Sequence, residues 1–169
     1  LTEAFNIMTE RLRTQVETLQ AERGKLAAVL SQMTDGVAIL DPQGKISLFN
    51  PAAARIFGME GDQALGRTAA QVFRQHQLVE LFRRCRESGT THSAAVEVGL
   101  ERVSLHAVAA PLGETLQGSI LLLFQDLTRL RRLEMVRHDF IANISHELRT
   151  PLASMQSLAE TLQSGALDD

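Results

Sequence analysis

The residues best suited to chemistry lie together near the C-terminal end of the sequence, between His146 and Pro151. A neutral imidazole is nucleophilic through its unprotonated nitrogen, and a carboxylate that holds the other nitrogen's proton fixes the tautomer and stabilises the developing positive charge. Glu147 follows His146 directly, and we expect its carboxylate to reach a ring nitrogen. This pair predicts a histidine able to attack a phosphoryl group brought from outside.

A helix over residues 127–163 must present this histidine, because apolar residues recur there at helical spacing. The apolar positions nearest to the histidine define one face of that helix: Ile141, Ile144 and Leu148. His146 lies on roughly the opposite face, which it shares with Asn143, Arg149 and Thr150. An exposed histidine on a helix is usually only a surface residue, so spacing alone does not establish a catalytic role.

Pro151 interrupts the same helical pattern, and the apolar stripe continues beyond it. A proline inside a helix removes a hydrogen bond and frees the carbonyl four residues earlier, here that of Glu147. We therefore expect a kink beside the reactive histidine.

The first 33 residues carry an apolar residue at every seventh position. These positions are Phe5, Leu12, Leu19, Leu26 and Met33. A seven-residue repeat of this length without proline predicts a coiled-coil helix. The alternative is an amphipathic helix packed on its own domain; the narrow seam between charged faces favours the coiled coil.

Residues 26–126 are predicted to form an α+β domain. Short apolar runs at 37–41, 46–49, 93–98, 103–110 and 119–125 predict five strands. Asn50 and Pro51 are an N-cap and a first helical residue, and Gly58 is a helix end. A second helix is expected over 75–87. The order β-β-α-α-β-β-β predicts an antiparallel sheet with helices on one side.

Composition excludes several classes of function. The net charge of -3 gives no support for nucleic-acid binding. The one cysteine, Cys85, cannot form an intramolecular disulfide or a multi-cysteine metal site. No stretch reaches the ~18 apolar residues of a membrane span, no signal peptide is visible, and a chain beginning with Leu1 is expected to be an excised piece. With aromatic residues at 4%, aliphatic side chains are expected to fill the core.

Three strings in the middle of the chain resemble the opening half of PAS sensor domains: residues 35–41, 44–46 and 50–58. Phe124-Gln-Asp-Leu-Thr128 is similar to the exit of PAS domains into an output helix. The resemblance implies a five-stranded antiparallel sheet with flanking helices, between a coiled-coil helix and a dimerisation helix. The PAS ligand stays open, because a small apolar or anionic metabolite and an aliphatic filling are equally consistent with the sequence.

The sequence contains no cysteine or histidine motif typical of a photochemical or metal cofactor. Residues 66–73 contain no cysteine where flavin-binding PAS domains carry one, and Cys85 is better explained as a buried apolar group. The remaining histidines are scattered and are interpreted as structural or surface residues: His76, His92, His106 and His138. No metal site and no cofactor are predicted for this segment.

Phe140-Ile-Ala-Asn-Ile-Ser-His-Glu-Leu-Arg-Thr-Pro-Leu152 resembles the H-box of histidine kinase dimerisation domains. The resemblance implies that His146 accepts phosphate, that Glu147 is its acid/base partner, and that Thr150 orients water when a response regulator is dephosphorylated. Arg149 would meet phosphate or a neighbouring carboxylate, and Asn143 would support the site.

Residues 1–12 resemble the closing part of a HAMP linker, and the order HAMP, PAS, H-box is similar to that of transmembrane sensor histidine kinases of the phosphate-regulon type. The implied domains are 1–25, 26–126 and 127–169. The implied protein is the cytoplasmic portion of a bacterial membrane kinase, a homodimer whose partner is a response-regulator receiver domain.

In such a kinase, ATP and Mg2+ bind a catalytic domain whose Asn-rich and Gly-rich boxes are missing from this sequence. We therefore expect this segment not to autophosphorylate alone. Two alternatives stay open: a PAS ligand-binding or dimerisation module with a non-kinase output, and a scaffold with a degenerate H-box.

Overall fold

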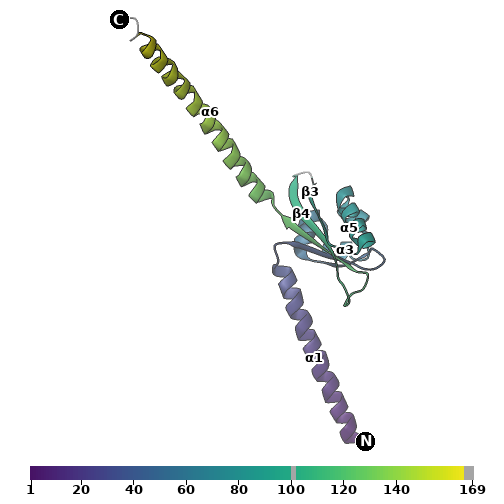
Figure 1. The fold of residues 1–169 in the computed structure, drawn as a ribbon. Helices are drawn as coiled ribbons and strands as arrows, with labels where there is room; N and C mark the ends of the chain where they lie inside the picture. The colour runs from purple at the N-terminus through teal and green to yellow at the C-terminus, as the bar shows by residue number, and fades with distance from the viewer. Residues whose placement is uncertain (100–101, 166–169) are drawn as a thin grey trace. The chain divides into compact units, whose positions relative to one another are not determined.

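The computed structural model describes residues 1–99 and 102–165. The chain divides into two compact units, Leu1–Leu127 and Thr128–Asp169. The first unit contains the N-terminal helix and a small α+β body; the second is a single long helix (Figure 1).

Helix α1 spans Thr2–Gln32, as the heptad pattern predicts. Met33 ends it with an extended backbone conformation. None of its residues is buried, and the seam residues Phe5, Leu12 and Leu19 each expose more than half of their surface. The seam therefore has no apolar partner within the described residues, and the coiled coil stays a prediction.

Five antiparallel strands form one sheet in the order β2-β1-β5-β4-β3. The strands are β1 Gly36–Leu40, β2 Ile46–Phe49, β3 His92–Val98, β4 Val103–Pro111 and β5 Ile120–Asp126. β1 and β5 are neighbours at the centre although most of the domain separates them in sequence, and Ala38 lies opposite Leu122. All five predicted strands are confirmed, with bounds shifted by a residue or two.

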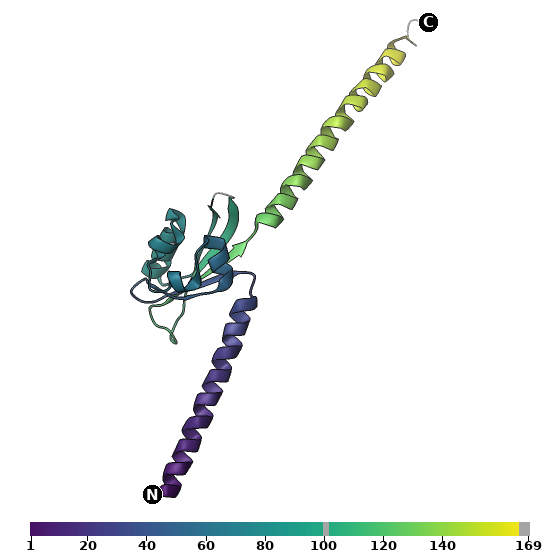
Figure 2. The ribbon, with the colours of Figure 1, turned by 180° about the vertical axis from the view of Figure 1, so that it is seen from behind.

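Four short helices lie on one side of the sheet in both views of the fold (Figures 1 and 2). They are α2 Pro51–Phe57, α3 Gly61–Ala64, α4 Ala69–Phe73 and α5 His76–Ser88. α2 begins as predicted: the Ala53 amide donates to the Asn50 side chain at 2.9 Å, and Pro51 is the first helical residue. Gly58 ends the helix in the left-handed conformation, with φ 62°. The predicted α+β class is confirmed.

The core lies between the sheet and these helices. Most of its buried side chains are aliphatic or alanine, as predicted, including Leu40, Leu78, Leu105 and Leu122. The core also contains an aromatic cluster: the ring centroids of Phe57 and Phe124 and those of Phe57 and Phe73 lie 4.9 Å apart, and those of Phe73 and Phe124 lie 5.3 Å apart. Such tilted and edge-on contacts add to the burial term.

Helix α6 spans Thr128–Gly165 and contains Pro151 within it. The assignment is one continuous helix through the proline, so the predicted disturbance does not end the helix. No residue of α6 is buried. This exposure matches α1, and each helix presents its apolar side chains without a partner inside the chain's described part.

Candidate functional site

His146 lies in the middle of α6, and its side chain is exposed. Since the whole segment is α-helical, successive residues turn by about 100°. The apolar face, with Ile144 39% and Leu148 56% exposed, is then on the side of the helix opposite His146. The imidazole is therefore open to a reaction partner that approaches from outside, while the apolar face is available for helix packing.

Glu147 does not hold the histidine proton in this structure. Within the described residues its carboxylate makes no hydrogen bond or ion pair with His146. The physical reason is that consecutive helical residues diverge around the axis and do not face each other. The expected contact is not formed here, and the catalytic role of Glu147 stays a prediction.

Thr150 and Arg149 lie one turn after the histidine. Four hydroxyls of α6 donate to the carbonyl four residues earlier: those of Ser145, Ser154, Thr161 and Ser164. The Thr150 hydroxyl has no such bond among the described residues, although its own carbonyl accepts from Ser154 Oγ at 3.1 Å. It is therefore available to a water or a partner. Asn143 shares this outward face one turn before His146.

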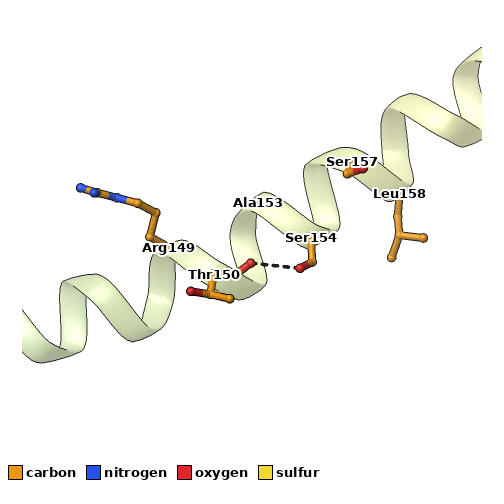
Figure 3. Close-up of a pocket in the computed structure, with 6 residues that line it drawn as sticks. All are labelled: Arg149, Thr150, Ala153, Ser154, Ser157 and Leu158. Carbon is orange, nitrogen blue, oxygen red and sulfur yellow. Dashed lines mark hydrogen bonds between the residues drawn. The ribbon is translucent and has the colours of Figure 1, made fainter.

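An open hollow follows the histidine on this outward side of α6 (Figure 3). Its six lining residues are Arg149, Thr150, Ala153, Ser154, Ser157 and Leu158. In Figure 3 the Arg149 side chain extends away from the helix, and small side chains at Ala153 and Ser157 leave the space. Sequence reasoning identified the first two and missed the others. The available signal was the small residue seven positions after His146, two helical turns away on the same face.

The other residues singled out by the sequence lie in the first unit or form no site. Cys85 is 0% exposed, and burial raises the pKa of its thiol, which fits a small apolar core group. His92 Nε2 shares hydrogen bonds with the hydroxyls of Ser88 and Thr90 on the surface. Across residues 1–99 and 102–165, no three His, Cys, Asp or Glu side chains gather as a metal site would require. None of the described helices combines the length and apolar character needed to cross a bilayer.

Comparison with known proteins identifies two domains. The PAS fold family matches residues 24–127, and the His Kinase A (phospho-acceptor) domain matches residues 136–169. The chain is 31% identical over 171 residues to the sensor protein kinase WalK of Staphylococcus aureus (strain Newman). That alignment covers 98% of this chain and 27% of the relative, so the chain spans about a quarter of the length of its curated relative.

Solved structures show the same fold. The PAS domain of BvgS from Bordetella pertussis is 18% identical with a TM-score of 0.51, over 76% of this chain and 98% of that one. A domain of a sensory box sensor histidine kinase/response regulator from Geobacter sulfurreducens is 20% identical with a TM-score of 0.50, over 64% and 96%. At these identities the likeness concerns the fold alone.

Proposed function

We propose that this chain, which belongs to the PAS fold family and also matches the phospho-acceptor domain family, is a sensing and phosphotransfer segment of a two-component histidine kinase, with His146 as its phosphoacceptor. The observation that carries the proposal is the exposed side chain of His146 on the face of α6 opposite the apolar stripe. Two exposed neighbours, Glu147 and Thr150, supply the groups that proton transfer and water orientation would use.

In the proposed reaction a ring nitrogen of His146 attacks the γ-phosphorus of ATP. The N–P bond forms as the bond from that phosphorus to the β,γ-bridging oxygen breaks, and ADP leaves. The other ring nitrogen keeps its proton, and the positive charge on the ring is stabilised when a rotamer change brings the Glu147 carboxylate to that N–H. ATP and Mg2+ would be bound by a separate catalytic domain of the full-length kinase.

Phosphate would then pass from His146 to an aspartate of a response-regulator receiver domain. The hollow beside Thr150 is suited to that partner, because it opens directly C-terminal to the histidine and on the same face. An unbonded Thr150 hydroxyl can orient a water for hydrolysis of the receiver's phosphoaspartate. Arg149 at the rim would pair with phosphate or with a carboxylate of the receiver.

The partner of the apolar faces is proposed to be a second copy of the chain. Long runs of exposed apolar side chains are unusual for an isolated soluble domain and mark an interaction surface. On α6 these are, among others, Leu133, Phe140, Leu148, Leu152 and Leu162. A parallel homodimer would bury both the α1 seam and this stripe. A signal at the PAS domain would shift the population between helix packings and so alter access to His146.

We also propose the domain bounds 1–25, 26–126 and 127–169, with residues 1–12 as the end of a HAMP linker. In this arrangement the chain is the cytoplasmic portion of a bacterial membrane kinase.

The test is phosphorylation of the full-length kinase with ATP labelled at the γ-phosphate. Wild-type protein is expected to gain acid-labile phosphate, and His146→Ala is expected to gain none. His138→Ala is the matched control, because it removes a histidine of the same helix and should leave labelling unchanged. Persistent label in His146→Ala, or no label in the wild type, would contradict the proposal and favour a PAS module with a non-kinase output.

Two further variants separate the roles of the neighbours. Glu147→Gln is expected to slow phosphorylation by about 10²–10⁴-fold, the usual contribution of a positioned acid or base. Thr150→Ala is expected to leave labelling intact and to slow dephosphorylation of the receiver. An equal loss of both activities in Thr150→Ala would show that this residue acts through helix structure instead.

A further inference from the structure

A pocket of about 440 Å³ opens on the α+β body of the first unit, away from α6. It lies where the end of α2, the α4–α5 junction and the end of β3 meet. Its apolar floor is formed by Phe57, Met59, Val72, Phe73 and Val98. Val72, Phe73 and Val98 belong to the buried core, so the pocket opens at the edge of that core, and its floor includes two rings of the aromatic cluster, Phe57 and Phe73.

Two arginines, Arg67 and Arg74, line the same pocket, and both are exposed. Neither makes an ion pair or a side-chain hydrogen bond within the described residues, and no carboxylate is among the pocket's described lining. Arg13, Arg83 and Arg84 of the first unit pair with a glutamate, and other arginines such as Arg55 do not, so what distinguishes Arg67 and Arg74 is that they line one pocket together. The protein as a whole has a net charge of -3, so two unpaired cations at one pocket form a local anion-attracting region.

The backbone at Arg74 is unusual. It ends α4 in the left-handed conformation, with φ 50° and ψ 24°, which side chains other than Gly, Asn and Asp rarely adopt. Glycine would occupy this position without strain, yet the residue here is an arginine, whose long cationic side chain lines the pocket. Strain of this kind is concentrated at ligand-binding positions.

We propose that this pocket binds a small organic anion with an apolar body, of the medium-chain carboxylate class. The planar guanidinium groups are suited to bidentate pairing with a carboxylate. The phenylalanine, methionine and valine side chains would cover the apolar part of the ligand. The volume lies within the usual range of small-molecule sites, ≈300–1,000 Å³. An anion without an apolar body would leave the apolar floor in contact with water. An uncharged hydrocarbon chain would leave Arg67 and Arg74 unpaired.

Isothermal titration of the 169-residue chain tests this assignment with three probes: octanoate, octan-1-ol and inorganic phosphate. Octanoate is expected to bind saturably and at least about ten-fold more tightly than either of the others, because only octanoate satisfies both the floor and the cations. Equal binding of octan-1-ol would overturn the role of the arginines. Equal binding of phosphate would overturn the role of the apolar floor, and an absence of octanoate binding would overturn the site.

Variants locate the binding. Arg67→Gln and Arg74→Gln are each expected to weaken octanoate binding by about five-fold, a value reduced for the exposure of both side chains. Arg55→Gln is the matched control, because Arg55 is an exposed arginine of α2 that does not line the pocket. A similar loss in Arg55→Gln would show a general charge effect and refute the assignment. Arg74→Gly also removes the cation while relieving the left-handed strain, so its loss of affinity with intact folding would exclude misfolding as the cause.

Discussion

Asn50 joins four segments of the first unit through one buried side chain. It is 2% exposed. Its Oδ1 accepts from the amides of Val37 at 2.8 Å and Ala53 at 2.9 Å. Its Nδ2 donates to the carbonyls of Leu30 at 3.2 Å and Asp35 at 3.0 Å. The last turn of α1, the connection to β1, β1 itself and the start of α2 are therefore held by one amide group.

Asn50→Ala is expected to destabilise this unit strongly. The buried amides of Val37 and Ala53 lose their acceptor, and each unsatisfied buried donor costs about 1–3 kcal/mol. The Ala53 loss is also the loss of the N-cap of α2, about 0.5–2 kcal/mol, so the two costs overlap. The carbonyls of Leu30 and Asp35 are only partly buried at this contact and can turn to water. The expected loss is about 3–5 kcal/mol, a large part of the ~5–15 kcal/mol typical of a domain.

Thermal unfolding followed by circular dichroism measures this loss of stability. Hydrogen exchange of peptides from β4 and β5 shows that the loss affects the sheet of the first unit. The midpoint should fall by at least about 12 °C, since 1 kcal/mol shifts a domain of this size by roughly 4–8 °C. Asn50→Ser is the matched control: a short hydroxyl can still cap α2 but cannot reach the carbonyl of Leu30, so it should recover about 1 kcal/mol of the loss. A loss below ~1 kcal/mol in Asn50→Ala would refute the reasoning.

Three other substitutions test separate features. Gly36→Ala should cost about 1–3 kcal/mol in urea unfolding, because a Cβ there would lie 3.1–3.2 Å from atoms of α2 and β5; Gly24→Ala, in open space, is the control. Arg74→Gly should stabilise the domain by about 0.5–1 kcal/mol in the same assay by relieving a positive φ, and any destabilisation would contradict this view of the strain. Hydrogen bonds from Arg83 and Arg84 lower the pKa of Glu80 from 4.5 to about 2, so the stability from this carboxylate is present above pH 4.5 and is lost as the pH falls toward 2. Glu80→Gln should accordingly flatten the melting temperature over that interval, and an unchanged pH profile would show that the cluster contributes nothing measurable.

The strands and the start of α2 were predictable because their signals are local. Alternation or continuous apolar runs mark each strand, and the Asn50-Pro51 pair with Gly58 marks one helix. Helices α3 and α4 were not predicted, because elements of four and five residues are too short to show a helical period. The sequence did carry one signal for α4: Thr68 and Gln71 form a capping box.

Contacts between residues distant in sequence were not predictable in the same way. Asn50 was identified as a helix cap, a role that depends on the next three residues. Its bonds to the carbonyls of Leu30 and Asp35 span 20 and 15 residues, and no local sequence pattern marks them. The aromatic cluster is similar, since the contacts among Phe57, Phe73 and Phe124 result from tertiary packing and not from any sequence period.

Helical periodicity predicts which face of α6 carries His146, but it does not predict which side chains contact that histidine. Because no residue of α6 is buried by the described part of the chain, rotation of about 100° per residue is enough to place His146 opposite Ile144 and Leu148. That same rotation separates the side chains of His146 and Glu147, so their adjacency in sequence does not by itself bring them into contact. In the proposed reaction the carboxylate therefore reaches the imidazole through a different rotamer. His146 would then be exposed but would gain the Glu147 carboxylate as a hydrogen-bond partner only when the catalytic domain with ATP docks. Its reactivity would therefore depend on docking. On this reasoning, Glu147→Gln should slow phosphorylation in the full-length kinase, where the catalytic domain docks at His146.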